Sequence, residues 1–503
     1  MKTVAPYGTW VSPITAQAVA SMARVFTCPR VNPQSGRAFF GETTPDGRKT
    51  IMEITKSGLR TVLPSEYSAE NSIYGYGAAI FGILADDRII FSNRDQTVCL
   101  LNPDSGEVTE VFGSPCLHYG SFSTTLSSPW ILAVEEDRTD STAEGTQNHV
   151  VAINSDTGEI KRVLTGADFY FQPRFSADGT RLSWTQYNRP ELPYTDVKLH
   201  CADWSEDGTI KNARLVAGMG HESVAEPRWG PDGSLFFAKE VGSFRQLYRI
   251  PPDTLQHIPI ELTDLEEAEF SFAGHVDSIN TYTVLDKDHI LATPLINGIN
   301  RAISIEITTG KWKQLAKYEN ICQGVLETED VIELSDYLLA TERVQLGAIG
   351  FTGASAGGYT TLQVLSKYSK KFAGGVCLYG VSDLETLDMA IHKIEADIVP
   401  AFVLGYPPQR PTNKEELEVY HERSAIHHIK GITSPLLLIH GKEDTVVPIA
   451  QARRVYQALE HHGADMELLE IPAEGHMLSK PATVQITIEE KENWWRKTLL
   501  KCV

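Results

Sequence analysis

Residues 353–359, Gly-Ala-Ser-Ala-Gly-Gly-Tyr, constrain the fold of this chain more than any other stretch. An apolar, strand-like run precedes them (346–352), and apolar residues at helical spacing follow them (359–365). They contain the pattern Gly-x-Ser-x-Gly, in which glycines flank the serine because a strand that turns sharply into a helix leaves no room for side chains. The pattern predicts an α/β fold with Ser355 raised above the sheet at the turn.

This turn, the predicted nucleophile elbow, gives five residues a role. Ser355 is the predicted nucleophile, and Gly353, Gly357 and Gly358 are the elbow glycines. The backbone N–H of Ala356 lies at the predicted helix start, where it can donate to an oxyanion. By composition alone a chain of this length contains about 0.2 such patterns. The motif therefore needs partner residues before it indicates catalysis.

Partners follow in the order Ser, Asp, His that this fold requires. A buried-strand pattern at 435–440 leads into a loop with Asp444, and a strand at 467–471 leads into a loop with His476. Catalytic groups gather at the carboxyl ends of parallel strands. We therefore predict that His476 takes the proton of Ser355 and that Asp444 orients and stabilises the imidazole.

Two weaker interpretations of these loops remain. Glu443 is a second carboxylate beside Asp444, but it does not hold the position expected of the orienting residue. Asp444 could also be a plain turn residue and His476 a surface histidine. The complete set in the required order favours the catalytic interpretation over both.

The elbow, the stretch Leu-Leu-Leu-Ile-His-Gly-x-x-Asp-x-x-Val-Pro at 436–448 and the Gly-His at 475–476 resemble the prolyl oligopeptidase family of serine peptidases. The resemblance is to its acylaminoacyl-peptidase and dipeptidyl-peptidase-like branch, and its specific motifs lie between residues 327 and about 500. It implies a β-propeller before an α/β-hydrolase domain. It also implies that the propeller limits access to small or unstructured substrates.

The N-terminal part has the pattern of an all-β domain. Short alternating or β-branched runs are separated by turns, without a long helical period. Turn glycines at 106, 158 and 208 are 52 and 50 residues apart, and the next is at 310. The phrases Gln-Pro-Arg-Phe-Ser at 172–176 and Glu-Pro-Arg-Trp-Gly at 226–230 are 54 residues apart. A period near 50 predicts propeller blades, about six or seven in number.

We thus expect an N-terminal leader (1–24), a β-propeller (25–318) and an α/β-hydrolase domain (319–503). The last domain is expected to be incomplete. The final propeller phrase (303–312) is followed within about 15 residues by a helical segment (327–339), where the resembling family has about a hundred residues. The resemblance implies that these hold further sheet strands and a second oxyanion donor.

Four strands are found in the parallel sheet, at 346–352, 373–379, 435–440 and 466–471. A parallel sheet truncated at its N-terminal half leaves the elbow strand with an unpaired edge, which makes a homo-oligomer plausible. Loss of one oxyanion donor is expected to lower the rate roughly a hundredfold to a thousandfold.

Composition excludes several partners. A net charge of −20 repels nucleic acid and anionic membranes. Seven scattered cysteines without metal-type spacing, no glycosylation sequon, no apolar membrane span and no signal peptide favour a cytoplasmic protein. The histidine pairs at 427–428 and 461–462 lack matching carboxylates, so no metal site and no cofactor are expected.

The favoured function is a serine hydrolase that cleaves peptide or acyl-amino bonds through an acyl-enzyme on Ser355. Its partner would be a peptide or a small acyl substrate. A first alternative is an esterase or acyl-transfer enzyme acting on a small natural product. A second is a non-catalytic propeller scaffold with a decayed hydrolase domain.

Overall fold

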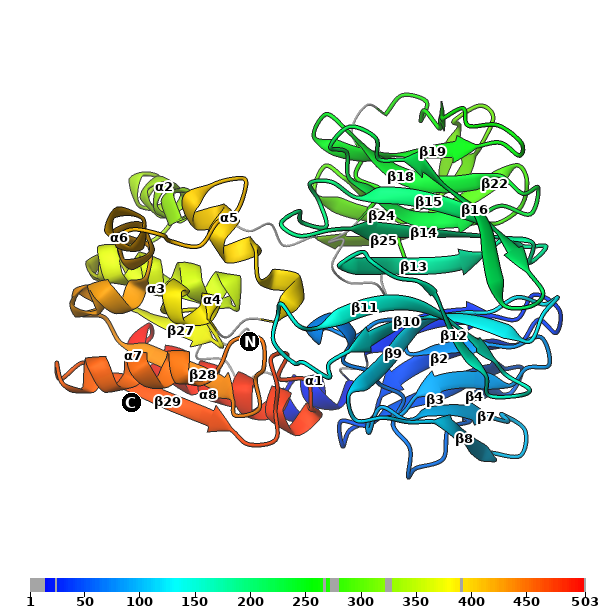
Figure 1. The fold of residues 1–503 in the computed structure, drawn as a ribbon. Coiled ribbons are helices and arrows are strands. Elements are labelled where there is room, and N and C mark those ends of the chain that lie inside the picture. The colour runs from blue at the N-terminus through cyan, green and yellow to red at the C-terminus, as the bar shows by residue number, and fades with distance from the viewer. Residues whose placement is uncertain are drawn as a thin grey trace, which may run out of the picture. The chain divides into compact units, whose positions relative to one another are not determined.

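The computed structural model describes residues 14–22, 25–265, 268–271, 280–321, 328–389 and 392–501. The chain divides into two compact units (Figure 1). The α/β unit comprises the described parts of residues 1–24, 44–47 and 324–503. The propeller unit comprises those of residues 25–43 and 48–323.

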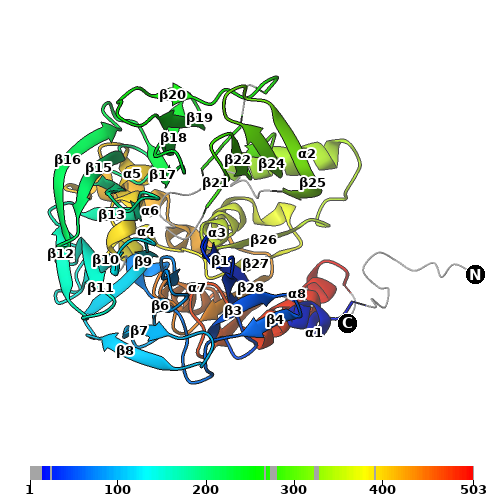
Figure 2. The same cartoon turned by 90° about the vertical axis from the view of Figure 1, so that its right-hand side faces the viewer.

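The described part of the propeller unit contains six antiparallel sheets, which follow one another around a ring in Figure 2. The first strands of successive sheets contact one another, and so they line the centre of the ring. The predicted propeller is confirmed, with six blades.

The first three sheets are β1 (Phe26–Val31), β2 (Ala38–Thr43), β3 (Lys49–Thr55) and β4 (Gly58–Thr61); β5 (Phe81–Ile83), β6 (Ile89–Ser92), β7 (Val98–Leu101) and β8 (Val108–Phe112); and β9 (Leu117–Ser123), β10 (Trp130–Asp137), β11 (Gln147–Asn154) and β12 (Ile160–Leu164). The other three are β13 (Phe169–Phe175), β14 (Arg181–Tyr187), β15 (Lys198–Ser205) and β16 (Thr209–Ala217); β17 (Val224–Trp229), β18 (Leu235–Val241), β19 (Phe244–Ile250) and β20 (Ile258–Pro259); and β21 (Tyr282–Val284), β22 (His289–Ala292), β23 (Leu295–Ile296), β24 (Ile299–Glu306) and β25 (Trp312–Ile321).

The regularly spaced glycines occupy equivalent turns. Gly106, Gly158, Gly208 and Gly310 each lie between the last two strands of a sheet, and their φ angles are between 67° and 78°. Residues with a Cβ rarely adopt this left-handed conformation. The repeat found in the sequence therefore follows from one turn geometry used in four blades.

The two phrases of the sequence repeat form matching bulges in β13 and β17. Gln172 and Glu226 have φ angles of 48° and 53°, and the pairing register shifts at each. Cys28 in β1 has the same conformation (φ 50°) and is also followed by Pro-Arg. This bulge is therefore a third copy of the feature, which the spacing of the other two did not predict.

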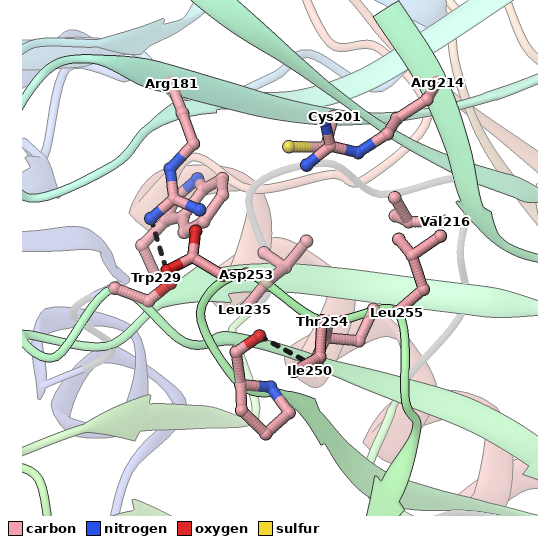
Figure 3. A pocket seen from close by; sticks show the side chains of 12 residues that line it. Arg181, Cys201, Arg214, Val216, Trp229, Leu235, Ile250, Asp253, Thr254 and Leu255 are labelled. Atoms are coloured by element: carbon pink, nitrogen blue, oxygen red, sulfur yellow. Dashed lines mark hydrogen bonds between the residues drawn. The ribbon is translucent and has the colours of Figure 1, made fainter.

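Neighbouring sheets pack closely. A pocket between the fourth and fifth sheets has a volume of only about 20 Å³, and Figure 3 shows its lining side chains. The Arg181 guanidinium lies 4.8 Å from the centroid of the Trp229 ring, and its Nη2 donates to Gly233 O at 3.2 Å. Since a buried water needs about 10–15 Å³, the pocket has room for about one water molecule.

The α/β unit contains a parallel sheet in the order β26-β27-β28-β29, made by Gly350–Ala354, Gly374–Leu378, Leu436–Gly441 and Met466–Ile471. These are the four strands predicted from the sequence. Within the described residues β26 pairs only with β27, and Thr352 and Ala354 are exposed. The truncation implied by the resemblance stays a prediction.

Helices cover both faces of this sheet. Side chains of α3 (Ala356–Tyr368) and α7 (Ala450–Glu460) pack with Leu436 and Leu438 of β28 on one face. On the other, Trp494 and Trp495 of α8 (Pro481–Thr498) pack with Leu437 and Ile439. Because β28 is buried on both faces, its sequence is apolar without interruption.

The chain contains further helices. Helix α2 (Thr328–Ala340) lies at the segment predicted to be helical (327–339), and it contacts α3. The segment after β27 contains α4 (Leu384–Asp388), α5 (Ile398–Leu404) and α6 (Lys414–Glu422). Helix α1 (Ala16–Met22), from the predicted leader, contacts α8. None of the helices described is long and apolar enough to cross a membrane.

Candidate active site

Ser355 lies at the turn between β26 and α3, as the elbow motif predicts. Its backbone angles are φ 55° and ψ −118°, and its N–H donates to Leu378 O at 3.0 Å. This conformation costs a non-glycine residue about 1–3 kcal/mol of strain. The surrounding chain must therefore hold the turn in place.

Two of the three elbow glycines are required sterically. A Cβ on Gly353 would lie 2.1 Å from Gly357 O, and one on Gly358 would lie 2.5 Å from the Cα of Gly380. A Cβ on Gly357 would have no neighbour within 4 Å among the described atoms. The tight turn thus explains why glycine is needed at 353 and 358, but it does not explain the glycine at 357.

The side chain of His476 lies between those of Ser355 and Asp444. Its Nε2 is 2.9 Å from Ser355 Oγ, and its Nδ1 is 2.8 Å from Asp444 Oδ2. The three residues come from the ends of β26, β28 and β29. With the hydrogen on Nδ1, the imidazole donates to Asp444 and can accept the hydroxyl proton of Ser355.

Both oxygens of the Asp444 carboxylate have polar contacts. Its Oδ1 accepts from the N–H groups of Val446 and Val447, both at 2.9 Å, and its Oδ2 also lies 3.3 Å from His440 Nε2. Burial alone raises the pKa of this carboxyl, but the hydrogen bonds from His440, His476 and Val447 hold its pKa well below the usual range. Asp444 is therefore a carboxylate at neutral pH.

The loops that carry Asp444 and His476 are fixed to each other by their backbones. Lys442 N donates to Ile471 O at 2.8 Å, and Glu443 N donates to Glu474 O at 2.9 Å. A Cβ on Gly441 would lie 2.4 Å from Glu474 O, so only glycine fits at this approach. Close backbone contact explains how two strand ends hold the two side chains at hydrogen-bond distance.

Two neighbours of this site were not predicted. His440 is fully buried at the end of β28, and it contacts Asp444. The Tyr379 ring lies edge-on to the His476 ring, with centroids 4.7 Å apart. The sequence signal for His440 is its place in the motif at 436–448, near the end of a buried apolar strand and four residues before Asp444. Nothing in the sequence singles out Tyr379.

The structure also places the other residues named from the sequence. Ala356 is the first residue of α3, so its N–H has no acceptor within the helix. Glu443 is exposed and His476 bonds to its neighbour Asp444 instead. The histidine pairs at 427–428 and 461–462 are exposed.

Helix α5 and the residues just after it carry two exposed aromatic side chains. Phe402 is 69% exposed and Tyr406 is 52% exposed, whereas Val403 is buried. Helix α5 contacts α4 and α6.

Comparison with known proteins finds a family match for the C-terminal part of the chain. Residues 307–502 match the model of the prolyl oligopeptidase family. The acylamino-acid-releasing enzyme of Arabidopsis thaliana is 25% identical over 186 residues, which are 35% of this chain and 23% of that protein. The inactive dipeptidyl peptidase 10 of Rattus norvegicus is 29% identical over 157 residues, 31% of this chain and 18% of that protein. These matches span about a quarter or less of the relatives' own length.

A solved puromycin-hydrolyzing peptidase of Mycobacterium tuberculosis has a similar fold. The two structures superpose with a TM-score of 0.82 at 19% identity, over 99% of this chain and 98% of that one. The propeller-plus-hydrolase architecture predicted from the sequence is therefore that of a known peptidase structure. Residues 307–502 of this chain match the prolyl oligopeptidase family, and they include all four strands of the parallel sheet.

Proposed function

We propose that this chain is a serine hydrolase that cleaves peptide or acyl-amino bonds through an acyl-enzyme on Ser355. The observation that carries the proposal is the position of His476, 2.9 Å from Ser355 Oγ and 2.8 Å from Asp444 Oδ2. A base that contacts both a nucleophile and an orienting carboxylate is the arrangement that acyl transfer needs.

In the proposed reaction Ser355 Oγ attacks the carbonyl carbon while His476 Nε2 takes its proton. The N–H of Ala356 donates to the oxyanion of the tetrahedral intermediate. His476 then returns the proton to the leaving nitrogen as the C–N bond breaks. A water molecule, deprotonated by His476, releases the acyl group and restores Ser355. Asp444 keeps the imidazole oriented throughout.

The proposed substrates are small acylated amines and short peptides. The names of a matched relative and of a similar structure support this class, since one releases acylated amino acids and the other hydrolyses puromycin. We propose that the acyl group contacts Phe402 and Tyr406, which are exposed in the segment after β27. Because only one oxyanion donor is identified, we predict a rate roughly a hundredfold to a thousandfold below that of an enzyme with two donors.

A non-catalytic scaffold is the competing function, since one matched relative is named inactive. A scaffold has no need of a strained serine in hydrogen-bond contact with a histidine, and this contact favours the enzyme. The cytoplasmic location, the exclusion of nucleic acid and the homo-oligomer stay predictions.

The test is labelling of purified, monodisperse protein with a fluorophosphonate probe, with Ser355→Ala and His476→Ala alongside. We expect labelling that Ser355→Ala abolishes and that His476→Ala reduces strongly. An unlabelled protein that melts cooperatively would rule out the proposal in favour of the scaffold. Turnover of esters but not of amides by a labelled protein would replace the peptidase with an esterase.

A further inference from the structure

We propose that the propeller unit binds a divalent transition-metal ion, with Zn²⁺ as the best-fitting ion, between Glu191, Asp196 and His221. Each residue offers one ligand atom, and the three atoms lie within 4.8 Å of one another. Glu191 and Asp196 belong to the loop from β14 to β15, and His221 belongs to the loop from β16 to β17. The site would thus join two adjacent blades.

The Asp196 carboxylate is the observation that points to a cation. Asp196 is 8% exposed, and its Oδ1 has no hydrogen-bond partner among the described residues. Its Oδ2 lies 3.4 Å from Lys198 Nζ, but Lys198 is 44% exposed and such a pair contributes little. A buried carboxylate oxygen without a donor is costly, and a bound cation removes that cost.

The two loops are already joined beside the site. Val197 N donates to Glu222 O at 3.1 Å, and these residues follow Asp196 and His221 directly. The Thr195 hydroxyl donates to Glu191 Oε2 at 2.8 Å, and its Oγ1 accepts from Leu192 N at 2.9 Å. A hydroxyl donating to a ligating carboxylate is a common outer contact of metal sites.

The donor set decides which ion fits. Two carboxylates and one imidazole suit Zn²⁺ or a similar transition metal, whereas Ca²⁺ takes six to eight oxygen ligands. In a tetrahedral zinc site with bonds of about 2.0–2.1 Å, ligand atoms are about 3.3 Å apart. His221 is exposed and Glu191 is partly exposed, so both have room for a movement of about 1.5 Å. Water would take the fourth position.

The test is a Zn²⁺ titration of the chelator-treated full chain by calorimetry, with Ca²⁺ as the comparison ion. We expect one equivalent of Zn²⁺, a raised unfolding temperature and affinity at least tenfold lower in Asp196→Asn and His221→Ala. Co²⁺ in place of Zn²⁺ should give the absorption bands of a tetrahedral ion, and Asp196→Asn should remove them.

Two matched controls separate this site from adventitious binding. His289 is another exposed propeller histidine beside a carboxylate, with its Nδ1 3.1 Å from Asp286 Oδ1. His289→Ala should leave Zn²⁺ affinity unchanged, and so should His476→Ala, which removes the candidate catalytic imidazole. Unchanged binding in folded Asp196→Asn and His221→Ala, loss of binding in either control, or no saturable binding would overturn the proposal. Glu191→Gln repeats the test if Asp196→Asn does not fold.

Discussion

His440 Nε2 and Asp444 Oδ2 lie 3.3 Å apart, and both side chains are fully buried. The same nitrogen is 2.8 Å from Val447 O, a contact that requires the hydrogen on Nε2. Its Nδ1 has no partner among the described atoms. His440 therefore ties the Asp444 carboxylate to the backbone three residues further on, and it acts on His476 only through Asp444.

Replacement of His440 tests this positioning role. His440→Phe keeps an aromatic side chain but removes the donor, so we expect kcat, or the rate of probe labelling, to fall about tenfold, with KM nearly unchanged. His440→Gln, which retains a donor, should recover part of the loss. The exposed His462→Phe is the control. Equal rates in a folded His440→Phe would show that the contact has no role in catalysis.

Substitutions of Asp444 and of its neighbour Glu443 should differ sharply in their effect on kcat. Asp444→Asn places an amide where the imidazole N–H now donates, which favours the wrong tautomer, and we expect kcat to fall by about 10⁴. Glu443→Gln, on an exposed side chain of the same loop, should change kcat less than twofold. Steady-state kinetics on the best amide substrate measures both. Similar losses in the two variants would contradict the assignment of Asp444.

Asp444 also makes the folded protein sensitive to acid. Its pKa in the folded state is below the unfolded value of about 3.9. The carboxylate therefore contributes stability that is fully present above that value and is lost as the pH falls further. Chemical unfolding between pH 5 and pH 3 should show a shallower loss of free energy in Asp444→Asn than in the unaltered protein. Identical slopes would mean that the pKa of Asp444 is not depressed.

The effect of a Gly→Ala substitution in the elbow should depend on the room for a Cβ at that position. Gly353→Ala and Gly358→Ala add a Cβ at 2.1 and 2.5 Å from backbone atoms, and both should lower the unfolding temperature strongly. Gly357→Ala adds a Cβ into open space in α3, where alanine is favoured by about 0.5–1 kcal/mol. Thermal melts of the three variants check this order, and equal effects would show that crowding does not fix the turn.

The sequence predicted those features that depend on local conformation. The four sheet strands were recognisable because parallel strands are apolar throughout, and the blade repeat was recognisable because turns such as that at Gly158 need a positive φ. The bulge at Cys28 lies three blades before its copy at Gln172, and a search for steps near 50 residues does not compare them.

Contacts that no sequence motif marks were not predictable. The contact of His440 with Asp444 requires the loop after β28 to turn back on the strand. The group of Glu191, Asp196 and His221 comes from two loops of different blades, and its spacing matches no metal-binding motif. Such groupings arise only when sheets that are separate in the sequence are placed side by side.

The contact of α1 with α8 has a consequence for how the chain is made. These helices lie near opposite ends of the sequence but in one compact unit, with the whole propeller encoded between them. During synthesis α1 emerges before the propeller and α8 after it, while the blades, whose strands pair with near neighbours, can form one after another as they emerge. The propeller is therefore expected to fold before the α/β unit, whose α1–α8 contact forms only once α8 has been synthesised.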